Sequence, residues 1–285
     1  KFFQTPVHFH WNVLYYSLLI FRRGGCLVAK DMTSGKPLKL IWSFTIPLLI
    51  GNLFQQLYNM ADTFIVGRTI GVQALAAVGS TGSIVFLIIG FATGLTAGLA
   101  IPLAQRFGAK DYKGVKHSFY VSILISIAVA IVLTALSMIF CRQILEIMQT
   151  PSEIIDGAYD YLIVIFGGIF SSMAYNLLSN IFRSIGDAKT PLYFLVMACV
   201  MNIILDIVFI AVFGMGVEGA GYATVLSQIF SAVACVVYIW NKIPVLRLTK
   251  EDLVATKRNI REHCRISFPM AFQAVSYTHL TLPTN

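Results

Sequence analysis

The chain has 285 residues, of which 57% are hydrophobic and only 12% are charged, and its mean hydropathy is +0.77. A soluble domain carries roughly 25% charged residues, so this composition excludes an ordinary soluble fold and indicates membrane-spanning helices. The net charge of +8 comes from Lys and Arg residues gathered in short segments between apolar runs. That pattern does not fit a nucleic-acid-binding face, and we expect no nucleic-acid partner.

The amino-terminal segment, residues 1–31, precedes the first methionine, Met32. Its apolar piece, 13–21, is too short to span a bilayer and ends at Arg22 and Arg23. We therefore expect residues 1–31 to be upstream sequence outside the native protein and to carry no function.

Six apolar segments follow, each bounded by charged or turn residues: 40–65, 72–103, 118–140, 161–182, 191–213 and 220–240. Each is long enough to span a bilayer as a helix, so we predict an all-α integral membrane protein with a six-helix lobe over residues 32–240. Pro47 is expected to bend the first span. The second span is overlong and is expected to tilt; its glycines at 90, 94 and 98 predict a smooth face for close helix contact.

Basic residues alternate between the loops. From residue 32 onward, only Arg68 and Arg142 lie on one side of the predicted membrane, and all other Lys and Arg residues lie on the opposite side. An excess of Lys and Arg marks the cytoplasmic side. We therefore predict a multi-pass protein of the cell (inner) membrane with a cytoplasmic amino terminus.

After the sixth span, a basic cytoplasmic linker over residues 241–265 leads into residues 266–273. These resemble the start of the first span, and we predict the beginning of a seventh helix and of a second half. The pattern is lost over residues 274–285, which we expect to be a non-native tail. The chain is thus expected to be a truncated amino-terminal half whose carboxy-terminal lobe is missing.

The first span hides a polar stripe. At 100° per residue its polar members fall within an arc of roughly 120°; they are Asn52, Gln55, Gln56, Asn59, Asp62 and Thr63. A carboxylate inside a membrane costs several kcal/mol unless it faces a polar cavity, binds a cation or takes up a proton. Asp62 is therefore predicted to be functional.

Further polar residues lie inside the later spans. Asn202 and Asp206 are four residues apart and share one helix face, while no Lys or Arg lies inside a span to neutralise the acids. The other polar residues are Asn176 and Asn180 in the fourth span and Thr224 and Gln228 in the sixth. Hydrogen bonds between helices, worth about 0.6 kcal/mol each, are the alternative role for Asn176, Asn180 and Gln228.

Carboxylate, amide and hydroxyl oxygens are hard ligands, suited to a hard cation rather than to zinc or copper. Burial also favours the protonated form of a carboxyl group. These residues could bind either Na⁺ or H⁺, and we expect no other cofactor. We expect no enzyme, because HExxH, GxSxG and Walker motifs are absent from the sequence.

Four segments resemble the amino-terminal lobe of multidrug and toxic compound extrusion (MATE) transporters: NLFQQLYNMADTFIVGR, QRFGAKDYKGVKH, FRSIGDAKTP and NIILDIVFIAVFGMGVEGAGYATVLSQ. The resemblance covers residues 32–273. It implies half of a twelve-helix protein, in which two six-helix lobes surround a central cavity and sodium or proton entry drives drug efflux. The resemblance places the cation or proton site, including any Na⁺ ligands, on Asp62, Asn202, Asp206 and Thr224. It places Gln55, Tyr58, Asn59, Asn176 and Asn180 near the cavity.

We therefore expect a cation-coupled antiporter that exports amphipathic, cationic drugs and other toxic organic compounds by alternating access. A lipid-linked glycan flippase of the same superfamily is the first alternative, although it is expected to line its cavity with Arg or Lys for the pyrophosphate. A non-transporting membrane fragment is the second. The expected partners are small organic molecules, the lipid bilayer and the missing carboxy-terminal lobe.

Overall fold

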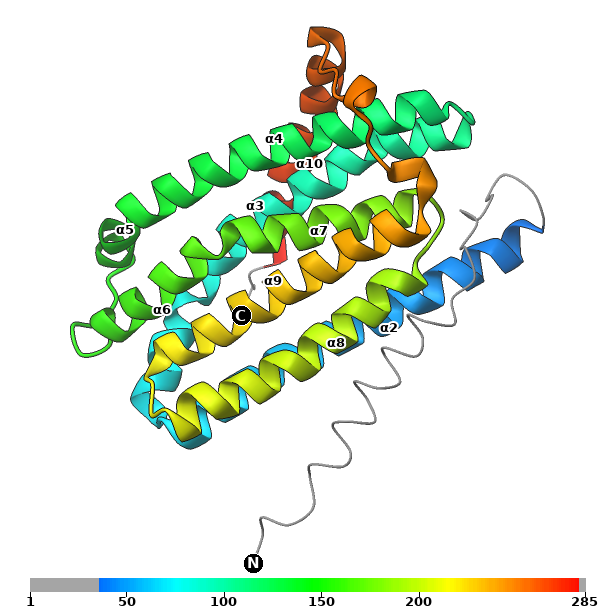
Figure 1. The fold of residues 1–285 in the computed structure, drawn as a ribbon. Helices are drawn as coiled ribbons and strands as arrows, with labels where there is room; N and C mark the ends of the chain where they lie inside the picture. Colours follow the sequence, from blue (N-terminus) through cyan, green and yellow to red (C-terminus); the bar gives the residue numbers. More distant parts are fainter. Residues whose placement is uncertain (1–35, 282–285) are drawn as a thin grey trace, which may run out of the picture.

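The computed structural model describes residues 36–281, and every regular element within this range is a helix (Figure 1). The prediction of an all-α membrane protein is confirmed. The predictions for residues 1–31 and for the last four residues of the chain lie outside the described residues.

Five helices are long and apolar enough to cross a membrane: α2 (Pro37–Thr69), α3 (Val72–Gly108), α4 (Tyr112–Ile139), α8 with η1 (Lys189–Val212) and α9 (Val217–Lys242). The prolines at 47 and 102 lie inside α2 and α3, which continue past them. The Asp111 side chain accepts a hydrogen bond from the Gly114 backbone N–H at 2.9 Å and so caps α4. The short helix α5 (Cys141–Ile147) follows α4.

The fourth predicted span, 161–182, is not one straight helix. It lies across α6 (Ile155–Gly167) and α7 (Ile169–Ser184), which bend by 48° at Gly168. A Cβ atom at Gly168 would overlap the Val225 side chain of α9, so the backbone of the bend packs directly against α9. Gly168 permits this close approach, because a side chain there would hold the helices apart, whereas a Cβ atom at Gly167 would meet nothing within 4 Å.

The fifth span changes its winding beside the predicted acid. Helix α8 (Lys189–Asp206) ends at Asp206, and a π-helical segment, η1 (Ile207–Val212), continues the span. Such wider turns are rare and occur frequently at functional sites. Asp206 therefore lies where the α-helix changes to a π-helix, and the neighbouring residues do not predict this change.

The spans alternate in direction, so the loops collect at two ends (Figure 1). The start of α2, the α3–α4 and α7–α8 loops and the segment after α9 lie at one end, and these carry the segregated basic residues. Two short 3-10 turns, η2 (Pro244–Leu246) and η3 (Lys250–Asp252), shape the segment after α9. The core between the spans is built from large buried side chains such as Leu95, Leu99, Phe166 and Phe182.

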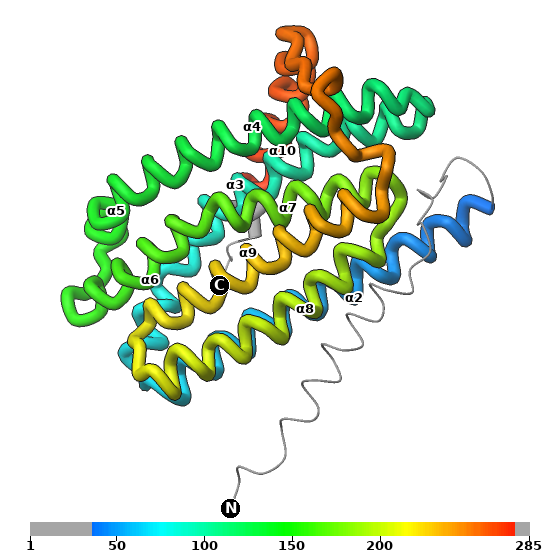
Figure 2. The backbone as a smooth tube through the Cα atoms, viewed as in Figure 1, coloured from blue at the N-terminus to red at the C-terminus, as the bar shows by residue number. Residues whose placement is uncertain are grey.

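The last helix, α10 (Lys257–Thr281), crosses behind α3 and α4 (Figure 2). A Cβ atom at Gly94 would lie 2.7 Å from the Met270 carbonyl oxygen, and one at Gly98 would lie 2.5 Å from the Ser267 Cα atom. The predicted smooth face of the second span is thus confirmed for these two glycines. A Cβ atom at Gly90 would meet only Phe86 of the same helix.

Helix α10 also differs from its predicted bounds. It begins at Lys257, inside the predicted linker, because Arg106 of α3 binds its first turns: the guanidinium donates to Asn259 Oδ1 at 3.1 Å and to Glu262 Oε2 at 2.8 Å. It continues to Thr281, beyond the predicted end of the seventh-helix segment at residue 273. The non-native origin of residues 274–285 stays a prediction.

Candidate functional site

A polar cavity of about 850 Å³ lies between α2, α3, α6, α7, α9 and α10. Its polar wall comes mostly from α2, through Asn52, Gln55, Gln56, Tyr58, Asn59, Asp62 and Thr63. The opposite wall, on α3, is apolar apart from small hydroxyl side chains such as Thr81 and Thr93. No Lys or Arg is among the described residues that line this cavity, so the charged group it contains is Asp62.

Asp62 of α2 and Asp206 of α8 form an acid pair. Asp62 is half-buried and lines the cavity, whereas Asp206 lies behind it and is fully buried. Their carboxyl groups are close enough to share a hydrogen bond. On each residue the Oδ1 atom is buried without a hydrogen-bond partner. Two carboxylates this close are both ionised only with a cation between them, and otherwise they hold a proton between them.

Thr224 of α9 connects the pair to the neighbouring helices. The Tyr58 hydroxyl donates to Thr224 Oγ1 at 3.1 Å, and the Asn202 side-chain amide lies 3.3 Å from the same oxygen. One orientation of that amide satisfies both of its ends: the nitrogen donates to Asp206 Oδ2 at 3.1 Å and the oxygen accepts from the Thr224 backbone N–H at 3.2 Å. The structure therefore brings together Asp62, Asn202, Asp206 and Thr224, the four residues of the predicted ion site.

The residues predicted near the cavity divide into two groups. Gln55, Tyr58 and Asn59 line it. Asn176 and Asn180, on α7, do not: Asn176 Nδ2 donates to the Ser172 carbonyl oxygen at 2.9 Å, and Asn180 Nδ2 donates to Thr96 Oγ1 of α3 at 3.4 Å. For Asn180 the hydrogen bond between helices is the role that the geometry supports, because α7 packs against α3 below the bend.

Two of the cavity residues that the predicted site did not include lie close to it. Tyr161 of α6 is 8% exposed and lies near both acids, and Gln228 of α9 lines the cavity one turn after Thr224. Gln228 was detectable from its spacing, because residues four apart share a helix face. Tyr161 was not, because only the bend at Gly168 directs this end of α6 toward the acids.

Comparison with known proteins bears on the family and the fold of the chain. The MatE family model matches residues 47–208. The chain is 34% identical over 200 residues to the protein named "Probable multidrug resistance protein YpnP" of Bacillus subtilis (strain 168). That match covers 70% of this chain and 45% of the relative, so the chain spans about half the length of the curated relatives it matches.

Two solved structures share the fold. One, described as "Outward-facing conformation of a multidrug resistance MATE family transporter of the MOP superfamily", superposes with a TM-score of 0.80 at 29% identity, over 86% of this chain and 54% of that one. A MOP superfamily transporter from Pyrococcus furiosus superposes with a TM-score of 0.82 at 28% identity, over 90% of this chain and 57% of that one. Its description reports a binding pocket of reverse polarity and suggests a different function.

Proposed function

The chain belongs to the MatE family and corresponds to the amino-terminal lobe of a MATE-type transporter, and on that premise we propose that it serves a cation-coupled antiporter. The protein would export amphipathic, cationic organic compounds by alternating access, in exchange for Na⁺ or H⁺. It would lie in the cell (inner) membrane with its amino-terminal end in the cytoplasm.

The observation that carries this proposal is the acid pair in the wall of a cavity without basic residues. The negative charge of Asp62 and Asp206 can be balanced by Na⁺, by H⁺ or by an organic cation in the cavity. Binding of one cation therefore weakens the binding of another, and this mutual exclusion is what exchange transport requires. The amphipathic character of the substrate follows from the cavity, which has an amide-rich wall on α2 and an apolar wall on α3.

The chemistry of the donor set fits Na⁺ as well as H⁺. Asp62 and Asp206 each have a carboxylate oxygen without a partner. The Asn202 amide donates to Asp206 Oδ2 in the orientation that satisfies both of its ends, and it would have to turn for its oxygen to join the Thr224 hydroxyl as a neutral ligand. Hard oxygen ligands of this kind suit a hard cation, while a shared proton needs only the two carboxyl groups. These four residues are therefore the proposed coupling site.

Helix α2 is suited to transmit the occupancy of the site. Of its residues only Pro47 and Val66 are buried, and it packs against the rest of the lobe mainly along α8. Its polar contacts with the rest of the lobe include the Tyr58–Thr224 hydrogen bond and the Asp62–Asp206 pair. A change of charge at Asp62 therefore acts on contacts that join α2 to α8 and α9, and we propose that α2 moves as the site fills and empties.

The lining of the cavity favours the exporter over the glycan flippase. A lipid-linked pyrophosphate needs basic side chains, and the lining residues include none. Transport can be tested on a protein that carries both lobes, in vesicles loaded with a fluorescent organic cation. Efflux that follows an imposed sodium or proton gradient supports the proposal, whereas transport of a lipid-linked glycan without cation efflux would overturn it.

A further inference from the structure

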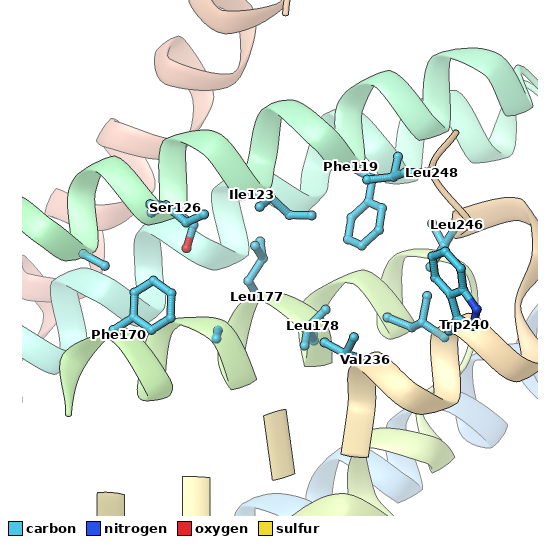
Figure 3. Close-up of a pocket in the computed structure, with 14 residues that line it drawn as sticks. Phe119, Ile123, Ser126, Phe170, Leu177, Leu178, Val236, Trp240, Leu246 and Leu248 are labelled. Carbon is cyan, nitrogen blue, oxygen red and sulfur yellow. The ribbon is translucent and has the colours of Figure 1, made fainter. Parts of the chain in front are cut away.

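A second cavity, of about 310 Å³, shares no lining residue with the polar one. Figure 3 shows the side chains that line it. It is formed by α4, α7, α9 and the segment that follows α9. Its lining is almost wholly apolar: Phe119, Ile123, Ser126, Ile127, Ala130, Phe170, Ala174, Leu177, Leu178, Val236, Ile239, Trp240, Leu246 and Leu248. The single hydroxyl group, on Ser126, offers a polar ligand almost nothing to bind.

The cavity opens toward the outer surface of the lobe. Leu177, Leu178 and Ile239 are buried and form its floor, whereas Phe170 and Val236 at its edge are exposed. Because α4 and α9 are membrane spans, the medium outside this edge is the hydrocarbon of the bilayer. A methylene group takes up about the volume of a water molecule, roughly 30 Å³, so the cavity holds about ten of them. That is a long stretch of one acyl chain.

One end of the cavity meets the cytoplasmic membrane boundary proposed above. Trp240 lies in the last turn of α9, and the segment after α9 covers the cavity with Leu246 and Leu248. Between these two leucines, the exposed Arg247 side chain donates to the carbonyl oxygens of Trp240 at 2.6 Å and Asn241 at 3.2 Å. These bonds use two of the five N–H groups of its guanidinium. A cation is thus fixed beside the cavity at the depth where lipid headgroups lie.

We propose that this cavity binds one acyl chain of an anionic phospholipid, whose phosphate group is held at Arg247 and Trp240. The apolar lining of the cavity matches the acyl chain of such a lipid. The tryptophan and the basic side chain at the opening of the cavity match its anionic headgroup. Since Leu246 and Leu248 belong to the segment that joins the lobe to α10, the bound lipid also stabilises the packed position of this segment. The site is independent of the acid pair.

Fluorescence quenching tests the proposal on the whole 285-residue chain. Phe replaces Trp11 and Trp42 so that Trp240 is the one tryptophan of the chain, and its emission is excited selectively over that of tyrosine. The protein is placed in phosphatidylcholine bilayers with a small share of phosphatidylglycerol. In one preparation the phosphatidylcholine carries brominated chains, and in the other the phosphatidylglycerol does. We expect brominated phosphatidylglycerol to quench about fivefold more than its share of the bilayer predicts, on the scale of one lipid-bound Arg. Arg247→Gln should remove this preference, while Arg258→Gln, an equal loss of charge elsewhere, should keep it.

Filling the cavity separates chain binding from general attraction of anionic lipid. Ala174→Leu and Ala174→Phe place bulk inside the cavity and should lower the preference in that order, whereas Ala128→Phe, on the exposed face of α4, should leave it unchanged. If Ala174→Phe aggregates, Ala174→Leu decides alone. Quenching in proportion to the lipid share in the parent protein, or an equal response of the variants at 174 and 128, would overturn the proposal.

Discussion

The Tyr58 hydroxyl on α2 donates to Thr224 Oγ1 on α9 at 3.1 Å, and so joins the first and sixth spans beside the acid pair. Thr224 is thereby a neutral member of the proposed coupling site and also a contact of α2. Both roles depend on one hydroxyl group, so variants of Thr224 can distinguish Na⁺ coupling from H⁺ coupling.

Thr224→Val keeps the shape of the side chain and removes its oxygen. If Na⁺ couples, the sodium concentration for half-maximal efflux should rise about tenfold, the equivalent of losing one hydrogen bond or ligand of about 1.4 kcal/mol. If only H⁺ couples, the pH profile of efflux should stay unchanged. Thr224→Ser, which keeps the hydroxyl, should behave as the parent protein in both cases. Equal effects of Val and Ser would remove the Thr224 oxygen from the coupling site.

The orientation can be tested with an impermeant thiol reagent in intact cells, using a variant whose native cysteines are replaced by serine. Cysteines at Lys113 and Lys189 should be protected until the cells are permeabilised, because both lie at the basic end of the lobe. A cysteine at Ser152, in the exposed loop before α6, should react at once. The reverse pattern would invert the orientation and place the acid pair in the other half of the membrane.

Because α10 packs closely on α3, adding a single methyl group at Gly98 is expected to lower the stability of the protein. Gly98→Ala would press a Cβ atom against the Ser267 Cα atom, and overpacking of this kind costs about 1–3 kcal/mol. We expect the midpoint of thermal unfolding, followed by circular dichroism, to fall by about 2–8 °C. Gly82→Ala is the matched control on the same helix, because nothing lies within 4 Å of its added Cβ atom. A fall of the same size in both variants would show that α10 does not pack at Gly98.

Asp252 stabilises the segment after α9 in a pH-dependent way. Hydrogen bonds from Thr249 and an ion pair with Lys116 at 3.0 Å lower the pKa of its carboxyl group to about 2. Because this pKa lies below that of an unfolded Asp, about 4, the stabilisation is complete above pH 4 and is lost as the pH falls toward 2. Asp252→Asn should lower the unfolding midpoint at pH 7, and the difference from the parent protein should shrink at pH 3.

The neighbouring exposed Glu251 supplies the control for that measurement. Glu251→Gln removes the same charge from the same turn but should leave the unfolding midpoint nearly unchanged at either pH. A deficit of Asp252→Asn that is constant from pH 7 to pH 3 would mean that its ionised form does not hold the segment.

The sequence was sufficient to locate the spans and the acids because both follow from local rules. Apolar length finds membrane helices, and a carboxyl group within an apolar run is conspicuous. The break at Gly168 was foreseeable in part, from the glycine pair at 167 and 168. Its consequences were not, because the contact with Val225 of α9 depends on two segments far apart in the chain.

The directions of the residues predicted near the cavity also depend on contacts between segments far apart in the chain. Asn176 and Asn180 are four residues apart and share a helix face, but the direction of that face is set by how α7 packs after the bend. The π-helical turns after Asp206 have no sequence signal that we recognise. The start of α10 at Lys257 depends on Arg106 of α3, a partner that periodicity within residues 241–265 cannot reveal.

The central claim is that the acid pair binds the coupling ion, and Asp206→Asn tests it most directly. The measurement is efflux of an organic cation from vesicles under an imposed sodium or proton gradient, in a protein that carries both lobes, with the exposed Asp160→Asn of α6 as control. The account predicts that Asp206→Asn loses gradient-driven efflux while its unfolding midpoint holds or rises, since a buried charge is removed, and that Asp160→Asn transports normally. Efflux by Asp206→Asn at the parent rate under either gradient would contradict it.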